Sequence, residues 1–479
     1  MTNPLAGLLL DAGRQQPGKM LLRTASGEAW TYADLDSSSS RFAHVLDELG
    51  VRPGDRVAVQ AEKSPEVLAL HVACVRAGAV YLPMNTAYTE RELADLVDDA
   101  QPSLLVRDAP FDRDIDQIGM GELTDRAAAQ PGTFDDVSRR DSDPAAILYT
   151  SGTTGRPKGA VMSQGNLVSS ARTLATAWGF TRDDVLLHAL PLFHTHGLFV
   201  AAYCTISTGG SMVMLDAFDP GLVIDALPAC TVMMGVPTHY TRLLASPDFT
   251  AAVASNVRLF TSGSAPMLLT THEEFRSRTG RSILERYGMT ETCMLTSNPL
   301  VGDRKPGTVG LPLPGVRVRV AGGSPGAVEV TGPNVFDGYW RRPELRATEF
   351  TSDGWFKTGD IGRFDADGYL EIVGRSKDLV ITGGLNVYPK EVEQVLDSLP
   401  GVRESAVFGL PDPDFGEAVT AVVVALPDTI LDADNLRLQA RQALASFKVP
   451  KRIHVLADLP RNAMGKVEKA RLREAFTQT

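Results

Sequence analysis

One segment of the chain combines hydroxyl side chains, glycines and a lysine in a pattern that suits the binding of an anion. Residues 149–159 read YTSGTTGRPKG and end an apolar run, 145–149, that predicts a strand. Glycines let the backbone approach an anion closely, and hydroxyl and N–H groups donate hydrogen bonds to phosphate oxygens. Lys158 adds a positive charge, but glycine follows it and not the Ser or Thr of a P-loop. The segment therefore predicts a phosphate site of another kind, with a flexible Ser/Gly loop as the alternative.

Five segments further along the chain carry acidic, basic or glycine residues that suit the same chemistry. They are YGMTET (287–292), TGD (358–360), GRSKD (374–378), GGLNVYPKEVE (383–393) and RNAMGK (461–466). Together with the first segment they resemble the signature motifs of the adenylate-forming superfamily, which includes acyl-CoA synthetases, aryl-CoA ligases, peptide-synthetase adenylation domains and luciferases. The motifs stand in the order of that family and cover residues from about 145 to 470.

The resemblance implies a reaction in two steps, in which a carboxylate first attacks the α-phosphate of ATP and a thiol, that of coenzyme A, then attacks the acyl-adenylate. Two anions meet in the first step, so cations must offset their repulsion. Lys466 would lie between the carboxylate and the α-phosphate. Glu291 would hold Mg²⁺, which prefers oxygen ligands. Thr290 and Lys158 complete the catalytic residues that the resemblance implies.

The resemblance also assigns the contacts with the nucleotide. Tyr287 would stack on adenine, Asp360 would accept hydrogen bonds from both ribose hydroxyls, and Arg375 would donate one to the ribose. The other residues predicted to contact ATP or AMP are Thr150, Ser151, Gly152, Thr153, Thr154, Gly288 and Met289. Structural alternatives remain open at this point: a surface ion pair for Glu291, a core position for Tyr287 and a turn for Asp360.

For the second step the resemblance implies that a small C-terminal domain rotates about Lys377 and withdraws Lys466. The rotation would bring Gly383 and Gly384 to the site, where the lack of side chains leaves a tunnel for the pantetheine arm of CoA. The basic residues that would meet the phosphates of CoA are Lys448, Lys451 and Arg452. A solvated surface is the alternative for these three.

The segments expected to surround the acid contain more polar side chains than a fatty-acid pocket would tolerate. A buried arginine is costly unless it meets an anion. Because Arg286 directly precedes Tyr287, we expect it to lie beside the nucleotide and to pair with the free carboxylate of a dicarboxylic acid. His196 and Ser264 are the weaker candidates for acid binding. A structural salt bridge between Arg286 and Glu285 is the alternative.

The segments ERYGMTET (285–292) and RNAMGK (461–466) resemble the malonyl-CoA synthetases in particular. This resemblance implies a ligase that forms malonyl-CoA or methylmalonyl-CoA and releases AMP and pyrophosphate. A fatty- or aryl-acid CoA ligase of the same superfamily is the alternative. Acetylation of Lys466 by an acetyltransferase, reversed by a deacetylase, is a hypothesis for regulation, because loss of its charge would stop the first step.

The elements that must position these residues are indicated by the spacing of apolar side chains. Helical spacing at 32–49 and 65–77 alternates with short apolar runs at 56–60 and 78–82. This alternation predicts a largely parallel sheet with covering helices. Further along, the alternating Val and Arg of 316–320 predict one strand of an antiparallel hairpin.

The expected fold class is α/β. A large N-terminal domain of mixed sheets covered by helices, with a β subdomain, would span residues 1–376. A small, mobile α+β domain would span 378–479 and carry the catalytic lysine, with the hinge at 377.

Composition argues against several classes of partner. Among 479 residues, 47 Lys and Arg stand against 58 Asp and Glu, a net charge of −11, so neither nucleic acid nor an anionic membrane is expected. The four cysteines are far apart and predict neither a metal site nor a disulfide framework. No apolar stretch approaches the roughly 18 residues of a membrane span. We therefore expect a cytoplasmic protein whose partners are ATP, a dicarboxylic acid and CoA.

Overall fold

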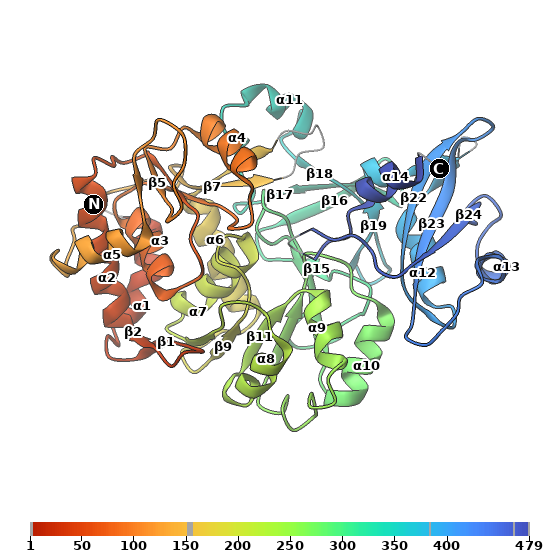
Figure 1. The fold of residues 1–479 in the computed structure, drawn as a ribbon, viewed down its shortest axis with the longest axis horizontal. Helices are drawn as coiled ribbons and strands as arrows, with labels where there is room; N and C mark the ends of the chain where they lie inside the picture. Colours follow the sequence, from red (N-terminus) through yellow and green to blue (C-terminus); the bar gives the residue numbers. More distant parts are fainter. Residues whose placement is uncertain (1–2, 151–156, 383–384, 463–464, 478–479) are drawn as a thin grey trace.

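The computed structural model describes residues 3–150, 157–382, 385–462 and 465–477. Its large N-terminal part contains two sheets covered by helices and a smaller β-sheet, and the C-terminal part forms a separate α+β unit at one end of the molecule (Figure 1). This is the α/β class that the sequence predicts, with the mixed sheets, the β subdomain and the small C-terminal domain.

The first sheet has six strands in the order β6-β5-β3-β4-β7-β8, all parallel except for β8. The strands are β3 (Arg56–Val59), β4 (Val80–Pro83), β5 (Leu104–Val106), β6 (Gln117–Ile118), β7 (Pro144–Thr150) and β8 (Lys158–Ser163). The helices that accompany them are α2 (Tyr32–Glu48), α3 (Pro65–Arg76), α4 (Glu90–Ala100) and α5 (Met120–Ala128). Helix α3 begins where the Ser64 side chain accepts a hydrogen bond from the Val67 amide and Pro65 fills the first helical position.

The second sheet has nine strands in the order β15-β14-β13-β12-β11-β9-β10-β1-β2, and the central six are parallel. Its strands are β1 (Met20–Thr24), β2 (Ala29–Thr31), β9 (Val185–His188), β10 (Ser211–Met214), β11 (Val232–Gly235), β12 (Leu259–Ser262), β13 (Ile283–Tyr287), β14 (Thr296–Ser297) and β15 (Leu311–Pro312). Its α-helices are α1 (Pro4–Arg14), α6 (Gln164–Ala177), α7 (Tyr203–Ser207), α8 (Pro220–Ala226), α9 (Pro237–Leu244) and α10 (Leu269–Thr279). A π-helix, η1 (His196–Ala202), leads into α7, and a 3₁₀ turn, η2 (Leu227–Ala229), follows α8.

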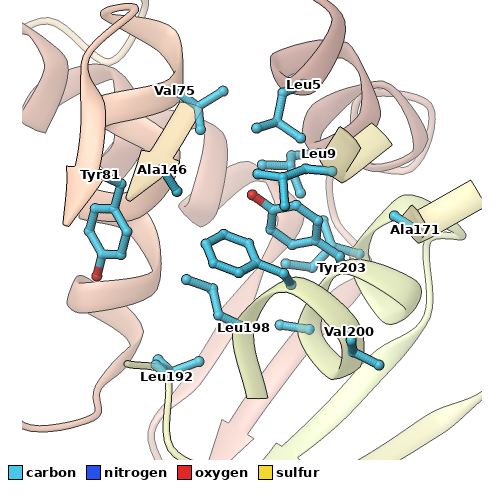
Figure 2. Close-up of a cluster of buried hydrophobic side chains, with 14 of the residues drawn as sticks. Leu5, Leu9, Val75, Tyr81, Ala146, Ala171, Leu192, Leu198, Val200 and Tyr203 are labelled. Atoms are coloured by element: carbon cyan, nitrogen blue, oxygen red, sulfur yellow. The ribbon is translucent and has the colours of Figure 1, made fainter. Parts of the chain in front are cut away.

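One apolar core joins these two sheets. Figure 2 shows side chains of α1 and α3 meeting residues of η1 and α7, with Tyr203 among them. The Tyr203 hydroxyl lies 2.7 Å from Nε2 of the buried His71, so its polar atom has a partner inside the core. Since the same cluster of buried residues contains strands of both sheets, we treat the large part as one packed body.

The β subdomain is a four-stranded antiparallel sheet, β16-β17-β18-β19. It contains β16 (Arg317–Ala321), β17 (Gly326–Thr331), β18 (Phe356–Phe364) and β19 (Leu370–Arg375), with the turns η3 (Pro343–Leu345) and α11 (Arg346–Glu349) in the connection between β17 and β18. The hairpin predicted from the alternating Val and Arg of 316–320 is confirmed as β16 and β17.

The C-terminal unit follows a short 3₁₀ turn, η4 (Ser376–Asp378), after β19. It contains β20 (Val380–Thr382), β21 (Leu385–Val387), α12 (Pro389–Asp397), β22 (Val402–Asp412), β23 (Gly416–Ala425), α13 (Ala433–Ala443), β24 (Arg452–Leu456) and α14 (Lys469–Thr477). Its five strands form one sheet with its own buried apolar clusters on both faces. Among the residues that the structure describes, no helix is long and apolar enough to cross a membrane.

Candidate active site

Three of the predicted nucleotide-binding residues meet where the ends of β13 and β19 approach the middle of β18. Asp360 of β18 and Arg375 of β19 are register partners in their sheet, and Arg375 Nε lies 3.0 Å from Asp360 Oδ1. The Tyr287 hydroxyl, at the end of β13, donates a hydrogen bond to the other carboxylate oxygen of Asp360. Burial raises the pKa of Asp360 and the Arg375 charge opposes that rise. The turn alternative for Asp360 is therefore wrong, because it is a buried strand residue with two partners.

A second group of predicted residues lies at the expected phosphate end of the site. Thr150 and Lys158 are register partners across the β7–β8 hairpin, so the two strands hold the ends of the Ser/Thr/Gly loop together. The Lys158 ammonium lies 2.8 Å from Glu349 Oε1 and near the ring face of Tyr339. Ser151, Gly152, Thr153 and Thr154 lie outside the described residues.

Glu291 is buried beside this group. Its side chain is 4% exposed and Oε1 accepts a hydrogen bond of 2.9 Å from the Tyr339 hydroxyl. Burial raises the pKa of its carboxyl group. The surface ion pair that was the alternative for Glu291 is therefore wrong. Tyr339 and Glu349 were missed by sequence reasoning, because no motif surrounds them and they approach Glu291 and Lys158 only through the fold.

The turn that carries Thr290 and Glu291 depends on a glycine at its start. A Cβ atom on Gly288 would lie 1.9 Å from the Cys293 carbonyl oxygen, so no side chain fits there. The Thr292 amide donates to the Met289 carbonyl and closes the turn. Gly288, Met289 and Thr290 thus follow directly on Tyr287, between the nucleotide group and the buried Glu291.

Lys466 reaches this site from the C-terminal unit. Its amide donates to Asn462 Oδ1 at 3.0 Å, which shapes the end of the RNAMGK segment. A Cβ on Gly465 would lie 3.3 Å from the Thr238 hydroxyl of α9, so the segment touches the large part of the molecule. Burial lowers the pKa of Lys466; the Arg375 charge lowers it further, and Asp360 and Glu291 raise it. The lysine therefore lies among the residues of the nucleotide and phosphate groups.

Arg286 is buried beside the nucleotide group without a protein counterion. It is 3% exposed, and its Nε and Nη2 atoms have no hydrogen-bond partner among the described residues. The guanidinium lies against Gly263, where a Cβ would be 2.4 Å from Nη1. Burial lowers its pKa to about 10, so it stays charged near neutral pH. The salt bridge to Glu285 is wrong, because Glu285 accepts hydrogen bonds from His272 and from the Gly307 amide.

The side chains around Arg286 also have polar atoms without protein partners. His196, at the start of η1, is 3% exposed, and neither ring nitrogen has a partner within the described part of the chain. Burial lowers its pKa well below the usual value, as do the charges of Arg286, His194 and His239. Further buried atoms of this kind are Thr195 Oγ1, His239 Nδ1, Thr261 Oγ1 and Ser262 Oγ. Because buried polar groups are nearly always hydrogen-bonded, this cluster suits a ligand rich in acceptors.

Ser264 follows the cluster in an unusual conformation. It has a φ of 69°, a left-handed value that costs a residue with a Cβ free energy and is often found at functional sites. It is partly buried, immediately after Gly263 and the end of β12. Ser264 thus directly follows the glycine that contacts Arg286, and the assignment of Arg286, His196 and Ser264 to acid binding stays a prediction.

Two of the basic residues predicted to bind the phosphates of CoA are paired with carboxylates of the C-terminal unit. Lys448 pairs with Glu391, with 2.5 Å between the two charged atoms, and Lys451 pairs with Asp412 at 3.6 Å. Arg452 begins β24 and is exposed. Gly383 and Gly384 lie outside the described residues, and Lys377 is an exposed residue of η4.

Comparison with known proteins identifies the class to which this fold and site belong. A family model described as AMP-binding enzyme matches residues 9–340, and one for the C-terminal domain of these enzymes matches 391–466. The chain therefore belongs to the AMP-binding, adenylate-forming enzymes.

Several proteins of this class are similar to the chain along most of its length. ATP-bound MatB from Rhodopseudomonas palustris is 50% identical, with a TM-score of 0.96 over 100% of this chain and 99% of that one. A feruloyl-CoA synthase from an Amycolatopsis species is 37% identical over 94% of both chains. The mitochondrial malonate–CoA ligase ACSF3 of Mus musculus is 36% identical over 92% of this chain and 86% of its own. All three are similar to this chain along most of its length.

The arrangement of the two parts is closer to one form of the bacterial relative than to another. Apo MatB from the same organism, at the same 50% identity, has a TM-score of 0.85 against 0.96 for the ATP-bound structure. The position of Lys466 beside Asp360, Arg375 and Glu291 agrees with this closer match.

Proposed function

We propose that the protein is an ATP-dependent ligase that joins malonate or methylmalonate to coenzyme A through an acyl-adenylate. The observation that carries the choice of acid is Arg286, a buried guanidinium whose Nε and Nη2 have no hydrogen-bond partner among the residues that the structure describes. A buried charge of this kind is costly unless an anion meets it. A short dicarboxylate supplies one carboxylate for Arg286 and one for the reaction. The malonate–CoA ligases among its relatives support the same choice.

A fatty- or aryl-acid ligase is the second candidate, and the feruloyl-CoA synthase relatives favour it. A fatty tail or the aryl tail of ferulate has no second carboxylate that would neutralise the buried charge of Arg286. Such a tail is expected in a pocket lined mainly by apolar side chains. The feruloyl-CoA synthase and the malonate–CoA ligase relatives are almost equally similar in sequence, so the pocket residues are the better guide to the acid.

The proposed first step places the two anions among groups that hold or offset their charge. Arg286 binds one carboxylate of the acid, and the other attacks the α-phosphorus of ATP as pyrophosphate leaves. Lys466 lies between the attacking and the attacked group and stabilises the charge that both share in the transition state. Tyr287, Asp360 and Arg375 hold the nucleoside. Thr290, Lys158 and residues 150–154 donate to the phosphates.

Glu291 is the residue proposed to hold Mg²⁺. A carboxylate that is buried, with a neutral phenol as its hydrogen-bond partner, keeps oxygen lone pairs for a hard cation. Magnesium, when bound, would offset the charge of the phosphates. Among the residues that the structure describes, no group of three or more His, Cys, Asp or Glu side chains could hold a metal by itself, so the remaining ligands would be phosphate oxygens and water.

The proposed second step uses the other arrangement of the two domains, 1–376 and 378–479. Rotation about Lys377 would withdraw Lys466 and bring Gly383 and Gly384 to the site. The CoA sulfur then attacks the acyl carbon, and AMP leaves. Lys448 and Arg452 are the proposed contacts for the phosphates of CoA; Lys448 would have to leave Glu391.

Acetylation of Lys466 is the proposed regulation of the first step, because it would remove the positive charge that this step needs. Undiminished adenylation by the acetylated enzyme would contradict that proposal.

The test is pyrophosphate release with ATP and Mg²⁺ over a panel of acids, each with and without CoA. The panel contains malonate, methylmalonate, succinate, acetate, octanoate and ferulate. We expect malonate or methylmalonate to give the highest kcat/KM. Arg286→Ala should lower that value by about a hundredfold, because it leaves a carboxylate without its partner.

Arg242→Ala is the matched control. It removes an exposed arginine of α9 that is close to the pocket and faces solvent, so the choice of acid should not change. Preferential activation of octanoate or ferulate by the wild type would overturn the choice of a dicarboxylate.

A further inference from the structure

Lys63 is a cation of the large domain that no part of the proposed reaction uses. It lies in the loop between β3 and α3, and its ammonium donates three hydrogen bonds. The acceptors are His188 Nδ1 at 2.8 Å, the His188 carbonyl at 2.8 Å and the Leu215 carbonyl at 2.6 Å. The loop after β3 in the six-stranded sheet is thereby joined to the ends of β9 and β10 in the nine-stranded sheet.

These contacts fix the hydrogen position on His188. An ammonium group has no lone pair, so His188 Nδ1 must be the acceptor and Nε2 must carry the hydrogen. Nε2 lies 2.9 Å from the Gly197 carbonyl oxygen and donates to it. His188 is buried, and both burial and the Lys63 charge lower its pKa to about 3, so the ring is neutral. A chain of two hydrogen bonds thus runs from Lys63 to the first turn of η1.

Gly197 is the residue next to His196, whose ring nitrogens face the Arg286 cluster without protein partners. The backbone at Gly197 is already tightly placed, because a Cβ there would lie 2.0 Å from the Pro191 carbonyl oxygen. A π-helix is rare and often marks a functional site, and this one begins at His196. Any shift of the Gly197 carbonyl would therefore move His196 relative to Arg286.

We propose that Lys63 is a positioning residue for the acid: through His188 it holds the start of η1, and with it His196, in the arrangement that the free carboxylate of the acid requires. The inference rests on the proposed function, since it concerns the same pocket, and it adds a residue that does not touch the substrate. Its partners are 125 and 152 positions away in the sequence, so no local motif marks it.

The protonation of Lys63 gives the proposal a readout that a merely structural residue lacks. Burial lowers the Lys63 pKa to about 7, and Asp216 opposes that shift. The other titratable groups that face it are His188, and Glu62 and Tyr81, which line the same cavity of about 60 Å³. When the ammonium loses a proton, two hydrogens remain for three acceptors. His188 can then change tautomer: Nδ1 takes a proton from water and donates it to the lone pair of the neutral Lys63 amine, while Nε2 releases its proton to water. The bare Nε2 no longer donates to Gly197.

The experiment measures KM for malonate and for ATP, together with kcat, in the wild type and in Lys63→Met, His188→Leu and His188→Gln. We expect Lys63→Met and His188→Leu to raise the malonate KM about tenfold with little change in the ATP KM. Gln at 188 keeps an amide that can reach Gly197, so His188→Gln should restore most of the affinity. In the wild type the malonate KM should rise from about pH 6 to about pH 8.5, and in Lys63→Met it should be high throughout.

Arg76→Lys is the matched control, because Arg76 is the buried cation at the opposite end of α3, with its own acidic partners. It should lower thermal stability without changing the malonate KM. Unchanged malonate KM in Lys63→Met and His188→Leu, or equal increases in both KM values, would overturn the inference. Poor use of malonate by the wild type itself would instead overturn the proposed function. If Lys63→Met does not fold, the malonate KM of His188→Leu compared with that of His188→Gln still tests the inference.

Discussion

At the residue scale, the proposed role of Arg286 in acid binding depends on how closely the backbone approaches its guanidinium. Gly263 lies so near that any Cβ would overlap the guanidinium atoms. Arg286 supplies the positive charge, and the lack of a side chain at Gly263 allows the charge to lie at this position. Neither residue would fix the position of a carboxylate alone.

Gly263→Ala tests this close approach. The new methyl group would lie 2.4 Å from Arg286 Nη1, so the guanidinium must move. We expect the malonate KM to rise about tenfold while the ATP KM is unchanged, in steady-state pyrophosphate-release assays. Gly121→Ala, where a Cβ meets nothing within 4 Å, is the control and should behave as the wild type. An unaltered malonate KM in Gly263→Ala would show that the guanidinium position does not matter for binding.

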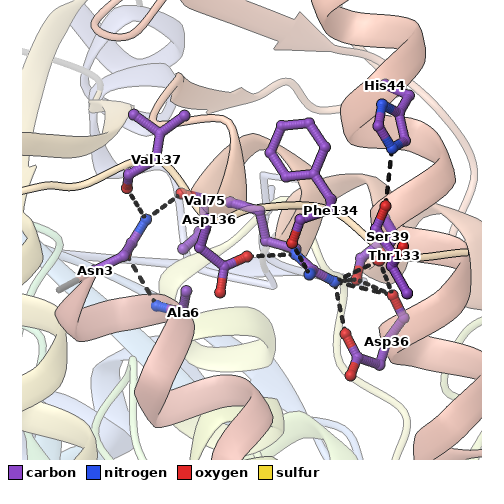
Figure 3. A network of polar contacts seen from close by, with 12 residues as sticks. Asn3, Ala6, Asp36, Ser39, His44, Val75, Thr133, Phe134, Asp136 and Val137 are labelled. Carbon is purple, nitrogen blue, oxygen red and sulfur yellow. Dashed lines mark hydrogen bonds and ion pairs between the residues drawn. The ribbon is translucent and has the colours of Figure 1, made fainter. Parts of the chain in front are cut away.

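At the element scale, α3 has a cation at each end, the partly buried Lys63 and the buried Arg76. Lys63 precedes its first turn and connects the two sheets. Arg76 ends it and connects α2 to the segment before β7 through Asp36, Asp136 and the Phe134 carbonyl. Figure 3 shows these three partners converging from two segments: Asp36 from α2, and Phe134 and Asp136 from the chain before β7. The Arg76 network joins segments beside the six-stranded sheet, and none of its residues belongs to the proposed active site.

Arg76→Met should lower the Tm by several degrees, because Asp36 and Asp136 keep only the more exposed Arg14 as a cation and the buried Ser39 and Ser40 hydroxyls lose a donor. The kinetic constants of the fraction that remains folded should be those of the wild type. Differential scanning calorimetry with parallel assays checks both. A changed malonate KM would mean that this end of α3 is also coupled to the pocket.

At the scale of the whole molecule, the C-terminal unit is placed so that Lys466 completes the site of the large domain. The contact that can be tested is the one between Gly465 and Thr238 of α9. A disulfide there would hold the two parts in the present arrangement, since a Cβ at 465 is 3.3 Å from the Thr238 hydroxyl oxygen, near the place that the new sulfur at 238 would take. The four native cysteines are buried and should not compete.

Thr238→Cys with Gly465→Cys should keep malonate-dependent pyrophosphate exchange when oxidised and lose most CoA-thioester formation. A reductant should restore the second activity in the same sample. Each single variant is a control, also for the strain of a side chain at Gly465, where φ is 73°. Equal thioester formation in the oxidised and reduced enzyme would contradict the proposed rotation.

The sequence predicts those features of this molecule that are local. The β16–β17 hairpin and helices such as α2 follow from the spacing of side chains within one segment. Asp360, Arg375 and Lys466 belong to short sequence motifs, so the resemblance to the family was enough to predict them as site residues. Lys63, Tyr339 and Glu349 could not be found in this way, because each acquires its partner only when distant segments pack together. Strand β8 and the π-helix η1 were also not predicted.

The adjacency of Arg286 and Tyr287 on β13 has a consequence for the length of the acid. Successive side chains of a strand point to opposite faces about 3.3 Å apart along the chain. One therefore faces the unpartnered cluster, and the other bonds to Asp360 of the nucleotide group. In the proposed first step, the pleat of this strand would set the span between the carboxylate bound by Arg286 and the phosphorus that the other carboxylate must reach. A diacid with more methylene groups would have to bend to meet both ends, and repacking the pocket wall would leave that span unchanged.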